Sequence, residues 1–174
     1  SISGNTLETI SILKNVEKLN AKFVAIFSGG IMEKYCKGKN IKSYKIHEEH
    51  SPRASFLGFL YSTLNILEQI IPVKKIDVNK SIQSLFNLQK IISSENLNET
   101  NEALQIAQWI KEIPMVYYPS GLQSTAIRFK NSMQENSKTH VMTEDVIEAC
   151  HNGIVAWDKP KNVQPILIQG KDDY

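Results

Sequence analysis

The sequence has few of the residues typical of secreted, membrane-spanning or nucleic-acid-binding proteins. Only two cysteines occur among 174 residues, Cys36 and Cys150, and no CxxC or Cys/His ligand spacing surrounds them. We interpret both as small, buried apolar side chains in a reducing compartment and expect a cytoplasmic protein. No apolar run approaches the roughly 18 residues of a membrane span, so we expect no membrane partner. The 20 basic and 18 acidic residues leave a net charge of +2, which is too small to suggest nucleic-acid binding.

Apolar spacing along the chain predicts alternating helices and short strands. A continuous apolar run at 23–27 predicts a strand buried on both faces, as in parallel sheets, and 113–118 is also predicted to be a strand. Further strands are predicted at 41–46, around Val141 and at 165–168, and helices over 7–19, 31–36, 52–71, 78–92, 103–110, 122–133 and 146–150. Gly38 is expected to close the second helix, and the third helix is expected to be buried on most of its sides.

This alternation is typical of an α/β protein with parallel strands. Two strand–helix series flank a helical stretch, although no clear sequence repeat relates them. We therefore predict two related units, at 1–73 and 102–174, joined by a helical linker at 74–101.

The first nine residues, SISGNTLET, form a hydroxyl-rich turn that opens directly into the first predicted helix. Asn5 and Glu8 have capping-box spacing, which predicts a helix start near Thr6. Free N–H groups at a helix start attract an anion, and the glycine of the motif lets the backbone come close. The hydroxyls of Ser1, Ser3 and Thr6 complete a phosphate cradle without a lysine, suited to a small monophosphate. A plain capped helix is the structural alternative.

This string resembles the signature of sugar isomerase (SIS) domains, which bind phosphosugars at this turn. Three later segments resemble the archaeal-type bifunctional phosphoglucose/phosphomannose isomerases: SPRA at 51–54, AIRFK and QENSK within 126–138, and EACHNGIV at 148–155. Glu135 and His151 are sixteen positions apart, a spacing that also fits these isomerases. The resemblance runs from Ser1 to about Trp157. It implies SIS-type parallel sheets wrapped by helices in two related units, each incomplete. Because the chain begins inside the motif, we expect an internal portion of a longer protein.

The resemblance implies that glucose 6-phosphate, and mannose 6-phosphate as well, is interconverted with fructose 6-phosphate through a cis-enediol. No cofactor and no metal are expected. Glu135 is assigned as the base that moves a proton between C1 and C2, a solvated glutamate being the alternative. By resemblance, His151 is expected to open the sugar ring and to reach the partner's site in a homodimer. Without the resemblance, His151 is interpreted as a histidine at a helix C-terminus.

Arg53 follows proline at a predicted helix start, where the helix dipole disfavours a cation and therefore points to an anionic partner. The resemblance implies that it stabilises the enediolate, whereas an ion pair with Glu48 or Glu49 is the structural alternative. Arg128 is interpreted as structural, on the helix that carries Glu135.

Two further clusters have mainly structural interpretations. Ser28-Gly29-Gly30 is read as a tight turn, with a second phosphate cradle as the alternative. His47 and His50, with Glu48 and Glu49, have the density of a metal site, but a solvated loop is favoured. Two other functions stay open: a non-catalytic phosphosugar-binding SIS module, and a structural half that pairs with another chain.

Overall fold

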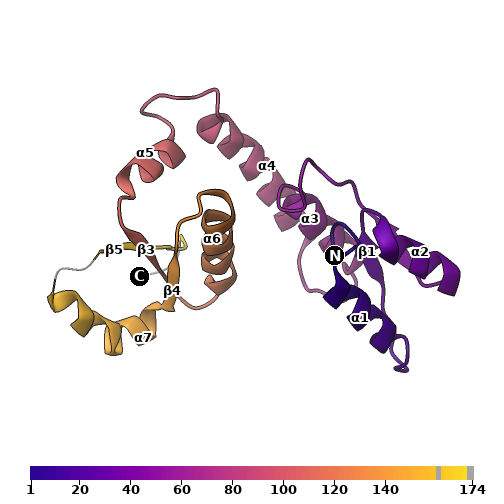
Figure 1. Cartoon of the computed structure of the whole chain (residues 1–174). Helices are drawn as coiled ribbons and strands as arrows, with labels where there is room; N and C mark the ends of the chain where they lie inside the picture. The colour runs from indigo at the N-terminus through magenta and orange to yellow at the C-terminus, as the bar shows by residue number, and fades with distance from the viewer. Residues whose placement is uncertain (160–161, 172–174) are drawn as a thin grey trace. The chain divides into compact units, whose positions relative to one another are not determined.

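The computed structural model describes residues 1–159 and 162–171 and divides into two compact units, Ser1–Ser84 and Leu85–Tyr174 (Figure 1). Each unit contains a parallel sheet, and helices precede and follow its strands in the sequence. The predicted α/β class is therefore confirmed. The division between the units lies within helix α4 (Lys75–Ile92). The domain boundaries predicted at 73/74 and 101/102 remain predictions. Within the described part of the chain, no helix combines the length and apolar character needed to cross a membrane.

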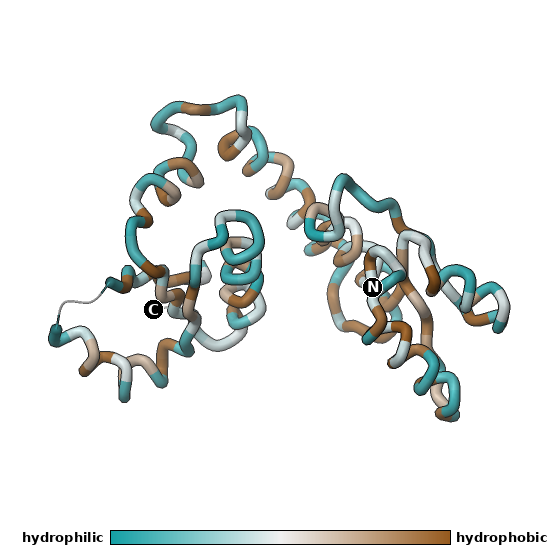
Figure 2. The backbone as a smooth tube through the Cα atoms, viewed as in Figure 1, coloured by the Kyte–Doolittle hydropathy of each residue, from teal (hydrophilic) through white to brown (hydrophobic). Residues whose placement is uncertain are grey.

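Unit 1 is built on two parallel strands. Its elements are α1 (Leu7–Val16), β1 (Ala25–Phe27), α2 (Gly30–Lys39), β2 (Ser43–Lys45) and α3 (Phe56–Ile66). Ala25 pairs with Ser43, and Phe27 pairs with Lys45. The apolar stripe of α1 and the inner face of α2 pack on β1, and their core consists of Ile10, Leu13, Ala25, Phe27, Met32 and Cys36. Figure 2 shows the resulting alternation of apolar and hydrophilic positions along these helices.

Several predicted helix boundaries in unit 1 are wrong, and helices α1 and α3 end earlier than predicted, at Val16 and Ile66. Helix α2 continues through Gly38 and ends at Asn40, whose φ of 53° lies in the left-handed region and whose N–H bonds back to the last turn. Asparagine tolerates this conformation, so it closes the helix as a glycine would. Helix α3 begins at Phe56 and not near Pro52, because Ser55 bonds through both its N–H and its hydroxyl to the Ser51 carbonyl and closes a turn first.

The prediction that α3 is buried on most of its sides is also wrong. None of its residues is buried, and Leu57 and Leu60 are 45% and 37% exposed. Apolar residues on several faces of a helix predict that other elements can pack against it. Whether the helix is buried depends on which elements do so.

Unit 2 is built on three parallel strands in the order β4-β3-β5. Its elements after α4 are α5 (Glu102–Trp109), β3 (Ile113–Tyr118), α6 (Gln123–Asn136), β4 (Met142–Asp145), α7 (Val146–His151), the 3₁₀ helix η1 (Gly153–Asp158) and β5 (Val163–Leu167). Val116 on the central strand and Ala126 on α6 are fully buried, and Val141 completes the core. The predicted strands and helices of this unit are confirmed to within a few residues. The prediction that Cys150 is buried is wrong, because this residue lies on the exposed side of α7, whereas Cys36 is buried in unit 1 as predicted.

Candidate functional site

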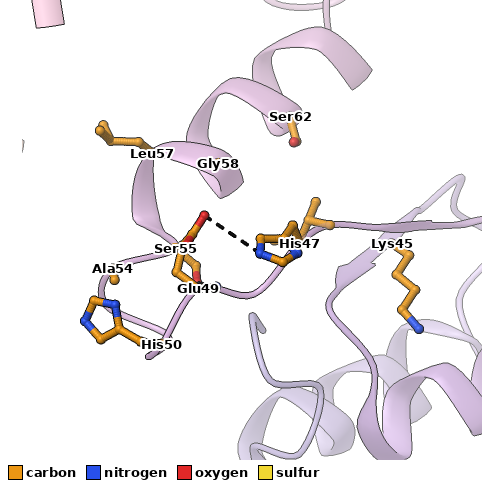
Figure 3. A pocket seen from close by; sticks show the side chains of 10 residues that line it. Lys45, His47, Glu49, His50, Ala54, Ser55, Leu57, Gly58 and Ser62 are labelled. Atoms are coloured by element: carbon orange, nitrogen blue, oxygen red, sulfur yellow. Dashed lines mark hydrogen bonds and ion pairs between the residues drawn. The ribbon is translucent and has the colours of Figure 1, made fainter. Parts of the chain in front are cut away.

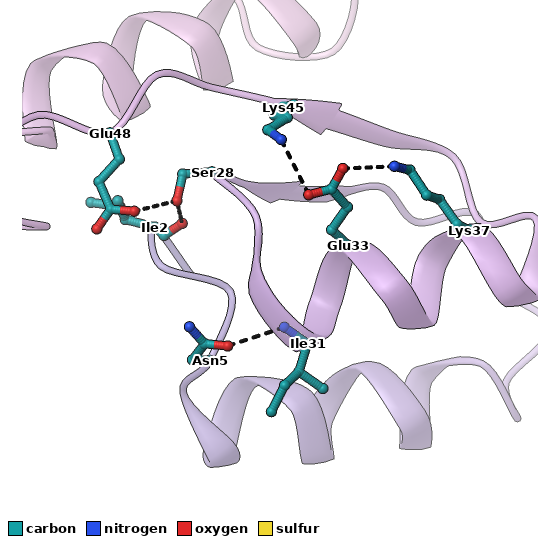
Figure 4. A network of polar contacts seen from close by, with 8 residues as sticks. All are labelled: Ile2, Asn5, Ser28, Ile31, Glu33, Lys37, Lys45 and Glu48. Atoms are coloured by element: carbon teal, nitrogen blue, oxygen red, sulfur yellow. Dashed lines mark hydrogen bonds and ion pairs between the residues drawn. The ribbon is translucent and has the colours of Figure 1, made fainter.

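The hydroxyl-rich loop Ser1–Thr6 lies directly against the turn between β1 and α2 (Figure 4). The Ile2 carbonyl accepts from the Ser28 N–H at 2.7 Å, and the Gly4 carbonyl accepts from the Met32 N–H at 2.9 Å. A Cβ on Gly4 would lie 1.9 Å from the Gly29 carbonyl oxygen, and the φ of Gly4 is +68°. Only glycine therefore allows the two backbones to touch at this point.

The three candidate hydroxyls gather where α1 begins. Ser1 Oγ lies 2.9 Å from Thr6 Oγ1, and Ser3 Oγ accepts from the Asn5 N–H at 3.3 Å. Helix α1 begins at Leu7 with Thr6 as its N-cap, and the Thr6 side chain makes no capping hydrogen bond to the first turn. Uncapped N–H groups beside hydroxyls suit a bound anion.

The predicted capping box is wrong, although the helix start near Thr6 is confirmed. Asn5 Oδ1 accepts from the Ile31 N–H at 3.1 Å, so this side chain caps the start of α2 across the loop instead of its own helix (Figure 4). Together with the bonds from the Ser28 and Met32 N–H groups, three backbone donors at the β1–α2 turn are used for internal contacts. This favours the tight-turn interpretation of Ser28-Gly29-Gly30 over a second phosphate cradle.

Arg53 is exposed in the turn that precedes α3. Because the helix begins three residues later, the expected repulsion by a helix dipole does not apply to Arg53, and the prediction of an anionic partner on that ground is wrong. Beside this turn lies an open groove of about 640 Å³, lined by residues of 45–50 and of the start of α3 (Figure 3). His47 Nε2 and Glu49 Oε1 face each other there at 4.0 Å. Within 1–159 and 162–171, no three His, Cys, Asp or Glu side chains are grouped to hold a metal ion.

Glu135 and His151 lie in unit 2, on the two helices that flank β4 in the chain. Glu135 is exposed in the last turn of α6, and its carbonyl accepts from Lys138 Nζ at 2.6 Å. His151 is the exposed last residue of α7, whose N-cap Asp145 accepts from the Ile147 N–H at 2.8 Å. Both residues therefore lie at helix C-termini, as predicted. The Glu135 carboxylate is unfavourably placed with respect to the helix dipole.

Comparison with known proteins shows which proteins this chain is similar to. Residues 99–174 match the family of the bacterial phospho-glucose isomerase C-terminal SIS domain. A bifunctional phosphoglucose/phosphomannose isomerase of Caldicellulosiruptor bescii is 30% identical over 184 residues, covering 100% of this chain and 54% of that protein. Its counterpart from Thermoplasma acidophilum is 31% identical over 152 residues, covering 87% and 45%. This chain is therefore similar to SIS-domain sugar isomerases.

A third relative of this chain has a different name. The D-glucosamine-6-phosphate 4-epimerase of Sulfolobus acidocaldarius is 27% identical over 174 residues, covering 97% of this chain and 53% of that protein. The chain spans about half the length of the curated relatives it matches.

Sequence reasoning missed two side-chain contacts of the two units. In unit 1, Ser28 Oγ bonds to Glu48 Oε2 at 2.5 Å. In unit 2, Trp157 Nε1 of η1 donates to Tyr117 Oη at 2.9 Å, and the two rings meet edge to face with centroids 6.4 Å apart. Each contact joins residues at least 20 positions apart. Hydrophobic periodicity along one element therefore does not predict it.

In unit 1, a cluster of ion pairs on the surface links helix α2 to strand β2. Hydrogen bonds from Lys37 at 2.8 Å and Lys45 at 3.2 Å hold the pKa of Glu33 below its ordinary value of 4.5 (Figure 4). Because the charged form is favoured in the folded state, the contribution of Glu33 to stability is present above that value. It is lost as the pH falls through the lowered pKa.

The backbone contact at Gly4 is tested with Gly4→Ala and a matched glycine in α2. Gly4→Ala forces a Cβ against Gly29, so we expect the free energy of unfolding to fall by at least about 2 kcal/mol. Gly38→Ala meets nothing within 4 Å and lies within a helix, so it should raise stability by roughly 0.5–1 kcal/mol. Urea unfolding measures both changes. Equal effects of the two substitutions would contradict the close contact.

Proposed function

We propose that this chain is part of a sugar-phosphate isomerase acting on hexose 6-phosphates. The reaction interconverts glucose 6-phosphate, and mannose 6-phosphate as well, with fructose 6-phosphate. The observation that carries the proposal is the uncapped start of α1, surrounded by the hydroxyls of Ser1, Ser3 and Thr6. Isomerase relatives that are 30–31% identical support the same reaction class.

In this proposal the Ser1–Thr6 loop binds the phosphate group of the substrate. The three hydroxyls and the first N–H groups of α1 donate hydrogen bonds to the phosphate oxygens, and the helix dipole favours the negative charge. A phosphate held away from the reacting carbons supplies binding energy that orients C1 and C2.

Glu135 then acts as the base. Its carboxylate removes the proton from C2 of the open-chain aldose while O1 gains a proton, which gives a cis-enediol. The glutamic acid returns its proton to C1 as the O2 proton leaves, which completes the ketose. Such general acid–base transfer contributes about 10²–10⁴-fold. Because C2 is trigonal in the enediol, glucose 6-phosphate and mannose 6-phosphate give the same intermediate.

Two further residues complete the proposed reaction. Arg53 stabilises the negative charge that develops on the enediolate oxygens, a role of the oxyanion-hole type. His151 transfers the proton between the ring oxygen and the C1 hydroxyl when the cyclic sugar opens. His151 acts in the partner subunit's site, so the active species is a homodimer.

The role of Glu135 is tested by Glu135→Gln in the full-length protein. We expect kcat for fructose 6-phosphate formation to fall about 10²–10⁴-fold with little change in ligand affinity, since the amide keeps the shape of the side chain but cannot accept the C2 proton. Glu112→Gln, an exposed glutamate of the same unit, is the matched control. Unchanged turnover in Glu135→Gln would remove the base assignment. Binding without any turnover in the unsubstituted protein would favour a non-catalytic phosphosugar module.

The subunit assignment of His151 is tested by complementation. Mixed dimers of Glu135→Gln and His151→Ala chains contain one intact site if His151 acts across the interface. Random mixing should then restore about a quarter of the unsubstituted activity, since half of the dimers are mixed and each has one good site. If activity does not recover although mixed dimers form, His151 acts within its own chain.

The epimerase relative favours a second candidate, epimerisation of an amino sugar phosphate at C4. The same loop suits its phosphate group. Incubation with D-glucosamine 6-phosphate separates the two reactions. Formation of the C4 epimer without any ketose from glucose 6-phosphate would replace the isomerase proposal with this one.

A further inference from the structure

The Glu48 side chain reaches Ser28 in the β1–α2 turn, against which the Ser1–Thr6 loop lies (Figure 4). Its Oε2 lies 2.5 Å from Ser28 Oγ, and both residues are half-buried. Ser28 Oγ lies 2.8 Å from the Ile2 carbonyl oxygen, to which the Ser28 N–H also donates at 2.7 Å. One serine therefore contacts the loop and the carboxylate together.

The distances indicate how these atoms share their protons. A serine hydroxyl has one proton and donates to one acceptor at a time. A separation of 2.5 Å is typical of a hydroxyl that donates to a charged carboxylate. Ser28 therefore donates its hydroxyl proton to Glu48, and its N–H holds the Ile2 carbonyl.

On its other side, Glu48 begins the segment 48–55, which contains Arg53. The Ile46 N–H donates to the Phe27 carbonyl at 2.9 Å, which ties the approach to this segment to the end of β1. Further along, the Glu49 N–H donates to Ser55 Oγ at 2.8 Å, and Ser55 is only 2% exposed. The segment is thus closed into one turn that includes Arg53.

We propose that Glu48 is a positioning residue that couples the phosphate-binding loop to the turn carrying Arg53. The path runs from Ile2 through Ser28 to Glu48, entirely within unit 1. It fixes the spacing between the group that holds the phosphate and the group that stabilises the enediolate. This inference rests on the proposed function, and neither Glu48 nor Ser28 touches the substrate.

The test uses Glu48→Ala in the full-length protein, with Glu49→Ala as the matched control. Glu49 has the same charge one position away, and its carboxylate lies 4.0 Å from His47 Nε2. We expect Glu48→Ala to lower kcat/KM for fructose 6-phosphate on the order of 10- to 100-fold, mainly through kcat, because Arg53 is displaced. Affinity for inorganic phosphate, measured by calorimetry, should fall less.

Two further variants separate positioning from a general loss of folding. Glu48→Gln keeps an acceptor for the Ser28 hydroxyl and should restore most of the rate. Ser28→Ala breaks the same path from the other end, so the double variant with Glu48→Ala should be no slower than the worse single variant. Additive effects would mean that the two residues act independently and would overturn the proposal.

The outcomes for Glu48 and for the proposed function are distinguishable. If the unsubstituted protein turns over and Glu48→Ala behaves like Glu49→Ala, the positioning role is wrong and the isomerase proposal stands. If the unsubstituted protein shows no turnover, the isomerase proposal fails. Amide hydrogen exchange of the Ser28 and Met32 N–H groups then decides the coupling: faster exchange in Glu48→Ala supports it, and unchanged exchange overturns it.

Discussion

The contact between Gly4 and the Gly29 carbonyl is the constraint on which the candidate phosphate loop depends. A polar loop is ordinarily mobile, because its residues bury too little surface to offset the entropy of ordering them. Here two backbones lie closer than any side chain allows, and Asn5, Ile2 and Ser28 bond across the contact. The ordering of the loop is therefore part of folding unit 1, and a ligand meets donors that are already placed.

The same constraint bears on the start of α1, which lies beside the three hydroxyls. An N-terminal side-chain cap would satisfy the free N–H groups of α1 and compete with an anion. Asn5, the residue suited to such a cap, is instead engaged by the Ile31 N–H of α2. A cross-loop contact thus leaves the first turn of α1 available while it stabilises the start of α2.

Sequence analysis predicted the features that depend on local periodicity. The strand at 113–118 and the helix that carries Glu135 follow from apolar spacing and turn residues, and the structure confirms both. It did not predict the partner of Asn5, 26 residues away, or the bond between Ser28 and Glu48, because such pairings arise only when strands bring distant turns together. The exposure of α3 has the same cause, since burial is a property of its neighbours. The roles of Glu135, His151 and Arg53 come from the resemblance alone.

The hydrogen bond between Trp157 and Tyr117 gives unit 2 a spectroscopic reporter of its own. Trp157 follows His151 by six residues, and its indole is fixed edge to face against a ring at the end of the central strand. Only one other tryptophan is present, Trp109, which is half exposed. Release of the η1 segment would replace a phenol partner with water around the Trp157 indole and shift its emission. Movement close to the candidate ring-opening histidine is therefore visible by fluorescence without any label.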